Sequence, residues 1–282
     1  MSNIIKLSDI YNIKDKATIN NVTNKVLQDM SGGVKKTRIR MTDLSTGETT
    51  ELHNKVLISG SIATASNLFI INPPIEIPNY NTALELENSM PSGTTPENTP
   101  IICLFGVADD GCGTLDSDVY VPGYVDRIAP ANLFPFRYIP AGRPDISHSE
   151  REIYFGRKTD TDGNISYYFK AFNNEPQLYL RYTDGTEITP ANMYNVVTTQ
   201  EAECYVQLDL SINRLDFRDY FDKVIGWDKA RISSVSLMYA WYTEDEGYKW
   251  YQSIIPFTKL NFSFEKLVDS TKALAFEYCL FF

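Results

Sequence analysis

The chain has 282 residues with 26 basic and 36 acidic side chains, and it is 43% apolar and 13% aromatic. This composition excludes an intrinsically disordered chain, and the length suffices for a full hydrophobic core without disulfides or metal. The net charge of −10 argues against a nucleic-acid-binding protein, and two histidines leave little material for metal or acid–base sites.

The N-terminus and the cysteines give mainly negative information. Residues 1–16 lack the apolar core of a secretory signal, and no stretch approaches the roughly 18 consecutive apolar residues of a membrane span. We therefore expect a soluble protein made in the cytosol, with no membrane partner. The four cysteines are scattered along the chain: Cys103, Cys112, Cys204 and Cys279. This spacing predicts small buried side chains rather than a zinc site or a disulfide framework.

Charge is distributed unevenly along the sequence. Residues 1–58 carry 9 basic and 6 acidic groups, residues 59–126 carry nine acidic groups and no lysine or arginine, and residues 127–282 carry 17 basic and 21 acidic groups. A solvated acidic loop region is one explanation of the middle stretch. The other is an acidic patch that meets a basic partner, such as the N-terminal segment of a neighbouring copy.

An amphipathic helix is expected near the N-terminus. Residues 15–30 place apolar side chains at helical spacing, and Gly32-Gly33 ends the pattern. This stripe packs either on its own domain or on another subunit, and we interpret residues 1–33 as a helical arm. Its candidate assembly contacts are Ile19, Val22, Val26, Leu27 and Met30.

The remaining residues, 34–282, are expected to form one domain. Residues 34–58 predict a hairpin with one basic face, and residues 61–70 a short helix. A solvated strand explains the basic face more simply than nucleic-acid contact does. Residues 72–100 hold six prolines and predict an extended loop, which we interpret as an arm that orders against a partner. Its candidate assembly contacts are Ile75, Ile77 and Tyr80.

Strand signals dominate from residue 101 onward. Residues 101–108 predict a buried strand, residues 133–140 an edge strand with prolines, and residues 152–172 a hairpin that turns at 162–164. Apolar and polar residues alternate strictly over 204–212, which is typical of a strand with one buried face.

One helix interrupts the later strands. Asn213 and Asp216 resemble a capping pair, an apolar stripe follows, and Gly226 ends the helix. Two more strands follow, and the chain finishes on an aromatic strand that ends with Phe281 and Phe282. Residues 274–282 of this strand alternate between two faces, with the even-numbered residues on one face. Such a strand must pair inside a sheet or against another chain, so these two residues are also candidate assembly contacts. The pattern predicts a mainly β fold: an antiparallel β-sandwich-like core with an N-terminal amphipathic helix and one or two short additional helices.

No catalytic, cofactor or metal site is expected. Residues 160–164, DTDGN, begin like a calcium loop, but the glycine is misplaced and no glutamate stands at the twelfth position, which favours a hairpin turn. The carboxylate pair Asp216 and Asp219 lies on a predicted surface helix, and neither histidine stands in a nucleophile context. Residues 239–251 include five aromatic side chains that are suited to sugar stacking: Tyr239, Trp241, Tyr242, Trp250 and Tyr251. Packing of such side chains across neighbouring strands is the commoner outcome.

The C-terminal third contains KARISSVSLMYAWY and SIIPFTKLNFSFEKLVDSTKALAFEYCLFF, where an apolar-Pro-Phe-x-Lys segment precedes the last strand. Earlier segments of interest are IYNIKDKATINNVTNKVLQDM, TRIRMTDLSTGE, FGVADDGCG, FPFRYIP and YYFKAF. Through these segments, most of the chain resembles virion structural proteins of large tailed bacteriophages.

This resemblance implies a non-enzymatic role in a ring of many copies, in the neck (head–tail connector), tail or baseplate of a virion. The expected partners are copies of the same chain and other virion proteins, with no nucleic acid, cofactor or small-molecule substrate. Closed rings arise from heterologous interfaces, for which a helical arm, a Pro-rich arm and segregated charge are suitable devices. A receptor- or carbohydrate-binding module is the alternative function, and a carboxylate-based glycan hydrolase is a further one.

Overall fold

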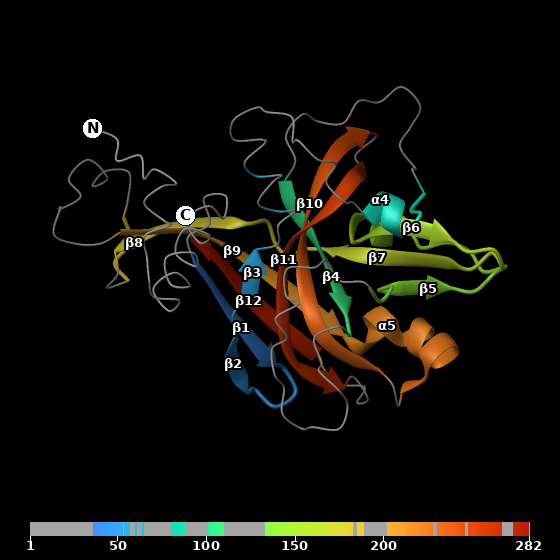
Figure 1. Cartoon of the computed structure of the whole chain (residues 1–282), viewed down its shortest axis with the longest axis horizontal. Helices are drawn as coiled ribbons and strands as arrows, with labels where there is room; N and C mark the ends of the chain where they lie inside the picture. The colour runs from blue at the N-terminus through green and yellow to red at the C-terminus, as the bar shows by residue number, and fades with distance from the viewer. Residues whose placement is uncertain are drawn as a thin grey trace, which may run out of the picture.

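The computed structural model describes residues 36–52, 54–56, 60, 64, 80–87, 101–109, 133–182, 185–188, 202–227, 230–245, 248–266 and 273–281. The expected N-terminal arm and most of the expected helix at 61–70 lie outside these residues. The described part is mainly β, as the sequence predicts, with two antiparallel sheets and short helices (Figure 1).

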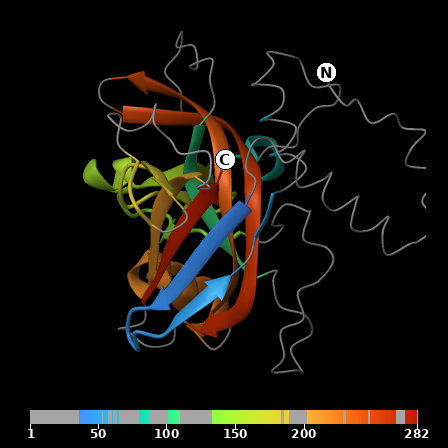
Figure 2. The ribbon, with the colours of Figure 1, turned by 90° about the vertical axis from the view of Figure 1, so that its left-hand side faces the viewer.

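Five strands form the first sheet, which we call sheet A, in the order β2-β1-β12-β9-β8. Their bounds are β1 (Lys36–Asp43), β2 (Thr49–Leu52), β8 (Gln177–Tyr182), β9 (Ala202–Asn213) and β12 (Ala273–Phe281). The pairing of β1 with β2 confirms the turn of the predicted N-terminal hairpin, but its return strand is shorter than predicted, because residues 54–56 pair with β11 (Tyr248–Lys266) in the second sheet. In Figure 2 the blue strand β1 lies between the lighter blue strand β2 and the red strand β12.

The last strand lies in the middle of sheet A. Strand β12 pairs with β1 on one side and with β9 on the other, so that Phe281 is opposite both Lys36 and Tyr205. This confirms that the C-terminal strand is paired inside a sheet. Its neighbour β1 is the first described strand of the chain. Sheet A therefore pairs the first described strand with the last one.

Seven strands form the second sheet, sheet B, in the order β3-β11-β10-β4-β7-β5, with β6 also paired to β7. Their bounds are β3 (Asn54–Val56), β4 (Ile101–Ala108), β5 (Arg137–Ile139), β6 (Tyr154–Thr159), β7 (Ile165–Ala171), β10 (Arg231–Asp245) and β11 (Tyr248–Lys266). The pairing of β6 with β7 confirms the predicted hairpin at 152–172.

The helices are short. α4 (Tyr80–Ala83) is a single turn, and the 3₁₀ helix η1 (Ser149–Glu152) precedes β6. α5 (Arg214–Tyr220) continues into the π-helical turn η3 (Phe221–Ile225), which ends at Gly226 with φ 89°, as predicted. Within the predicted loop at 72–100, residues 80–83 form the helical turn α4 instead, whereas residues 84–87 are turn and irregular backbone. Tyr80 and Leu86 bury their side chains in an apolar cluster with residues of sheet B.

One hydrophobic cluster draws on both sheets. Sheet A contributes alternate residues of β9 and β12, among them Leu210 and Phe276, and sheet B contributes Phe105, Val235 and Phe257, all at most 2% exposed. A buried hydrogen bond of 2.8 Å joins Tyr278 of β12 to Thr258 of β11. The period-two alternation predicted for β9 and β12 therefore selects the residues that face sheet B.

Candidate functional site

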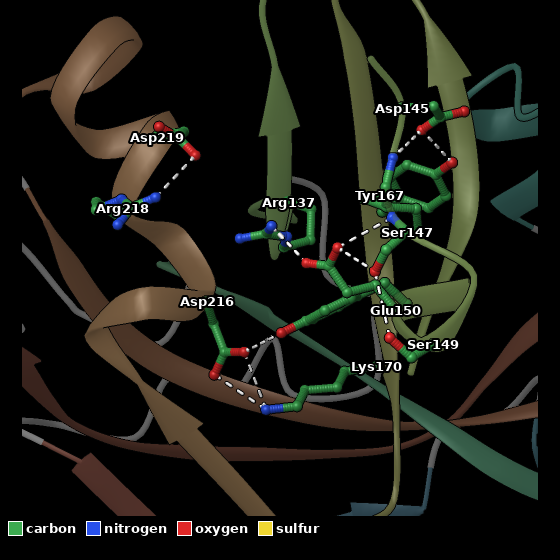
Figure 3. Close-up of polar contacts among 12 residues, drawn as sticks. Arg137, Asp145, Ser147, Ser149, Glu150, Tyr167, Lys170, Asp216, Arg218 and Asp219 are labelled. Atoms are coloured by element: carbon green, nitrogen blue, oxygen red, sulfur yellow. Dashed lines mark hydrogen bonds and ion pairs between the residues drawn. The ribbon is translucent and has the colours of Figure 1, made fainter. Parts of the chain in front are cut away.

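A buried ion pair lies where β7 meets the start of α5 (Figure 3). Lys170 Nζ lies 3.0 Å from both carboxylate oxygens of Asp216, and the two side chains are only 9% and 2% exposed. Lysine and aspartate are seldom this buried unless they are paired. This ion pair is the centre of the most elaborate polar cluster in the described part of the chain.

Asp216 is fixed by the local sequence at the start of α5. Asn213 is the N-cap residue: its side chain accepts a hydrogen bond from the Asp216 amide at 3.2 Å, and the Asp216 carboxylate accepts one from the Asn213 amide at 2.9 Å. This reciprocal capping box confirms the predicted capping pair. The capping box therefore orients the carboxylate through contacts within α5 and its N-cap residue.

Two further contacts tie the ion pair to the rest of the fold. The hydroxyl of Tyr154 on β6 donates a 2.8 Å hydrogen bond to Asp216, and Lys170 also donates to the carbonyl of Ser211 on β9 at 3.1 Å. Burial, and next the negative charge of Asp216, raise the pKa of Tyr154 well above its ordinary value. The phenol therefore stays protonated and remains a donor. Strand β7 of sheet B, strand β9 of sheet A and α5 thus meet at one lysine.

A pocket of about 530 Å³ adjoins the ion pair. It is lined by Arg137, Glu150, Glu152, Ile153, Tyr154, Lys170, Ala171, Phe172, Asn173, Asn213, Leu215 and Asp216. Ile153 and Leu215 are exposed apolar side chains, with 40% and 63% of their surface accessible. The pocket therefore combines two ion pairs, Lys170–Asp216 and Arg137–Glu150, with apolar side chains that water still reaches.

A second ion pair lies on the pocket wall. Arg137 on β5 and Glu150 on η1 are 2.5 Å apart, and the guanidinium also lies 5.5 Å from the ring centre of Tyr154. Glu150 accepts hydrogen bonds from the amide and hydroxyl of Ser147 at 3.0 and 2.8 Å. Partial burial acts to raise the pKa of Glu150, but these hydrogen bonds and the Arg137 charge outweigh it and lower the pKa.

A third carboxylate, Asp145, is hydrogen-bonded to residues of both β6 and β7. It accepts hydrogen bonds from the hydroxyl of Tyr167 at 2.8 Å, the amide of Ile146 at 2.7 Å and the guanidinium of Arg157 at 3.2 Å. Burial opposes ionisation, yet these donors together hold the pKa of Asp145 below its ordinary value. Arg157 in turn pairs with Glu87, in the segment that carries α4.

The carboxylate pair suggested by the sequence is not arranged for acid–base chemistry. Asp216 accepts hydrogen bonds on both oxygens, whereas Asp219, one turn later, pairs with Lys223 at 3.2 Å on the same helix. Among the described residues, no group of three histidine, cysteine or carboxylate side chains is placed to hold a metal ion.

The calcium-like segment 160–164 is a hairpin turn in the structure. The Asp160 carboxylate accepts from the amides of Asp162 and Asn164 at 2.9 Å each and from the Asn164 side chain at 2.8 Å. Hydrogen bonds from Asn164, foremost that of its side chain, lower the pKa of Asp160. The aspartate thus satisfies the turn backbone, as the hairpin interpretation predicts.

The aromatic residues of β10 and β11 do not gather on one face. Tyr239 packs against the cluster between the sheets and stacks on Phe257 at 6.0 Å, whereas Tyr251 packs in a second cluster, where its ring lies 4.7 Å from Phe155. Burial raises the pKa of Tyr251, as does its hydrogen bond to Cys103. This division follows the alternation of strand faces and argues against a single sugar-stacking platform.

Two candidate assembly contacts lie in the described part of the chain, and both are buried in it. Tyr80 is 5% exposed, with its ring 5.6 Å from Phe169, and Phe281 is 5% exposed, with its ring 4.9 Å from Tyr205. The others lie outside the described residues: Ile19, Val22, Val26, Leu27, Met30, Ile75, Ile77 and Phe282. Their assembly role stays a prediction.

The remaining singled-out residues divide between core and surface. Cys103 and Cys279 are buried thiols, as predicted, and Cys204 is half-buried, whereas Cys112 lies outside the described residues. His148 is exposed at the start of η1, and His53 lies outside the described residues.

Sequence reasoning missed the residues that build the polar cluster around Asp216. Lys170 stands among tyrosine and phenylalanine in the second strand of the hairpin predicted at 152–172, and a lysine in that setting was the available signal of a buried partner. No local pattern marks Tyr154, Arg137 or Glu150, because their partners are distant in the chain or belong to another element.

Comparisons with known proteins add no relationship: no protein-family model, curated protein or solved structure matches the chain. Among the described residues, no helix has the length and apolar character needed to cross a membrane.

Proposed function

We propose that the chain is a non-enzymatic structural component of a tailed-phage virion, forming a ring in the neck (head–tail connector) or tail. The observation that carries the proposal is how the carboxylates at the pocket are used. Asp216 and Glu150 are each held by a cation and by backbone donors, and they fasten elements of the fold to one another. Carboxylates that hold elements of the fold together suit a structural protein that must keep its shape when mechanical force acts on the virion.

Several features support assembly. The resemblance of the sequence to virion structural proteins gives the class, and the segregated charge and the N-terminal amphipathic pattern supply docking elements. We also propose that the two sheets are the layers of a β-sandwich, because one apolar cluster and the Thr258–Tyr278 hydrogen bond join them. The partners are copies of the chain and other virion proteins, the protein is located in the virion, and no nucleic acid or cofactor takes part.

Two measurements test this proposal. Mass spectrometry of purified particles is expected to find the chain, and light scattering of the recombinant protein is expected to show multimers whose mass rises with concentration. Deletion of residues 1–33 is expected to preserve the native circular-dichroism spectrum and to block assembly. Absence from particles together with a monomeric state at high concentration contradicts the proposal.

The second candidate function is a receptor- or carbohydrate-binding module of a baseplate, suggested by the half-exposed Trp241 and Trp250. Glycan-array binding that disappears in Trp241→Ala or Trp250→Ala supports this alternative. Hydrolysis of a cell-wall or capsular polysaccharide that is lost in Asp219→Asn supports the further alternative of a hydrolase. Neither result is expected for a structural ring protein.

A further inference from the structure

Lys170 and Asp216 bring an amine and a carboxyl group into contact in a place that water hardly reaches (Figure 3). Nζ lies 3.0 Å from both carboxylate oxygens, so the carboxyl carbon is at most about 3.4 Å from Nζ. This separation is that of a near-attack arrangement, in which the reacting atoms are about 3–3.5 Å apart. The last torsion of an aspartate side chain is soft, so a small rotation places Nζ over the face of the carboxyl group.

The surroundings of the pair favour condensation of the two groups. The ring centres of Phe136 and Tyr154 each lie 6.0 Å from Nζ, and the paired side chains are only 9% and 2% exposed. Two buried charges carry a desolvation cost that a neutral amide does not have. Groups held together by a fold react with effective concentrations on the order of 10⁵–10⁸ M. Little water is present at this buried place to hydrolyse the product.

The polar neighbours of the pair are placed to move protons and to stabilise developing charge. The hydroxyl of Tyr154 donates to Oδ1 of Asp216 at 2.8 Å, and the amide of Asn213 donates to Oδ2 at 2.9 Å. The Asn213 amide therefore stabilises the negative charge that develops on Oδ2 when the carbon is attacked. The phenol of Tyr154 is placed to give a proton to Oδ1 while it takes one from nitrogen. The carbonyl of Ser211 accepts from Nζ at 3.1 Å and holds the amine in place.

We infer that Lys170 and Asp216 condense slowly, after folding, to an amide (isopeptide) bond between their side chains. A proton first passes from Nζ to Oδ1 along their hydrogen bond, which leaves an amine beside a carboxylic acid. Nζ attacks the carboxyl carbon, and a second proton passes from nitrogen through the Tyr154 hydroxyl to Oδ1. The bond between the carbon and Oδ1 then breaks, so that Oδ1 leaves as water, Oδ2 becomes the amide oxygen and no other reactant is needed. The ion pair is the state of the newly folded protein, and the amide is the state that it reaches with time.

The amide links the two sheets through α5. Lys170 belongs to β7 of sheet B, and Asp216 stands at the start of α5, directly after β9 of sheet A. The bond closes a loop between residues 46 positions apart, which restricts the unfolded chain as a disulfide does. Both side chains line the pocket, which gives the released water a way out. The reaction takes place within one chain, so it does not depend on the proposed virion role, and a monomeric protein also forms the bond.

Mass spectrometry of the full-length recombinant protein tests the inference. The denatured protein is expected to be lighter than its sequence mass by one water, with the lighter form increasing during incubation at neutral pH. After trypsin digestion, residues 159–181 are expected to be joined to residues 215–218 as one branched peptide, because trypsin does not cleave at a lysine that carries an amide. The matched control is the pair Lys223 and Asp219, which are 3.2 Å apart but 46% and 28% exposed. Residues 219–223 are expected to be released with their full mass.

Two variants identify the reacting groups. Lys170→Arg keeps the cation, but a guanidinium is not a nucleophile, so this variant is expected to keep its full sequence mass. Tyr154→Phe keeps the ring and removes the proton relay, and the branched peptide is expected to form about 100-fold more slowly. An unchanged rate in Tyr154→Phe overturns the relay.

The wild-type measurement decides the inference even if a variant fails to fold. Wild-type protein that keeps its full sequence mass after prolonged incubation overturns the condensation. Loss of one water without the branched peptide also overturns it, because the Asp162-Gly163 sequence loses water in another way, by closing a succinimide. Neither result affects the proposed function, which is tested by particle composition and by oligomeric state.

Discussion

Apolar packing dominates the region between the two sheets, whereas the end of sheet B formed by β5, β6, β7 and the segment 80–87 combines a smaller apolar cluster with several ion pairs. Between the sheets, the largest buried side chains include Phe105, Phe276 and Tyr278. At the β5–β7 end, charged pairs join Lys170 to Asp216 and Arg157 to both Asp145 and Glu87.

The contrast shows two ways of specifying structure. Apolar burial is large but non-directional, so it selects which face of each strand is inside. A charged pair contributes less net energy, but it is satisfied only in one arrangement, so it selects which segment docks where. The β5–β7 end has short strands and a single helical turn, and charged pairs add their directional contacts to the apolar contacts there. Four changes test this contrast.

The largest effect is expected in the apolar region. Phe105→Ala removes a fully buried ring that lies 5.3 Å from Phe136, and it is expected to lower the free energy of unfolding by about 3–5 kcal/mol. Urea denaturation measures this change. Leu178→Ala is the matched control, because Leu178 on β8 is 70% exposed, and its expected effect is within about 0.5 kcal/mol. Equal losses in both variants would contradict the division.

The next largest effect is expected at the buried ion pair. Asp216→Asn keeps the size and a capping oxygen but leaves the Lys170 ammonium without its counter-charge, and a loss of about 3 kcal/mol is expected. In Lys170→Met/Asp216→Asn most of this loss is expected to return, because no unpaired charge stays buried. Lys158→Met is the control, since its partner Glu85 is 82% exposed and the expected loss is below about 1 kcal/mol.

A smaller effect is expected at the docking surface of the segment 80–87. Gly156→Ala combines a positive φ with a clash against Phe169, and we expect it to destabilise the protein by about 2 kcal/mol and to increase hydrogen exchange at the Glu87 amide. Gly142→Ala is the matched control: its φ is +78°, and nothing lies within 4 Å of the added Cβ. If both variants lose the same stability, backbone strain alone explains the result and the clash has no role.

The smallest effect is expected from pH. The pKa of Asp145 is lower in the folded protein than its ordinary value of 3.8. Asp145 therefore stabilises the fold above pH 3.8, and this stabilisation is lost as pH falls through the lower folded pKa. In Asp145→Asn the fall in stability on acidification is expected to be shallower, as measured by urea midpoints between about pH 5 and 2. Parallel curves for variant and wild type would show that the charge of Asp145 is immaterial.

The secondary structure could largely be predicted from the sequence, because period-two alternation and turn residues are local signals. Alternation located β9 and β12, the turn at 160–164 located the β6–β7 hairpin, and the Asn213–Asp216 capping pair located the start of α5. The loop predicted for 72–100 missed the helical turn α4 at 80–83, because the prolines on both sides are local loop signals and the burial of Tyr80 against sheet B is not a local signal.

The candidate site was predictable only in part. The capping pair identified Asp216, but nothing nearby in sequence indicated that Lys170, 46 residues earlier, would neutralise it. Tyr154 and Asp216 are 62 residues apart, and Arg157 and Glu87 are 70 apart. Pairs so distant arise from the order of strands in the sheet, which a single sequence does not state.

The sequence alone determined the mainly β class, the strand faces and the ends of α5, since these depend on side-chain periodicity and on capping within a few residues. Tertiary structure decided the rest. It placed the last strand between β1 and β9. It buried Cys279 and Phe281 on the face of β12 opposite the main cluster. It also paired Lys170 of β7 with Asp216 of α5, and Arg157 of β6 with Glu87 of the segment 80–87. The physical reason is that burial and charge pairing depend on which elements become neighbours.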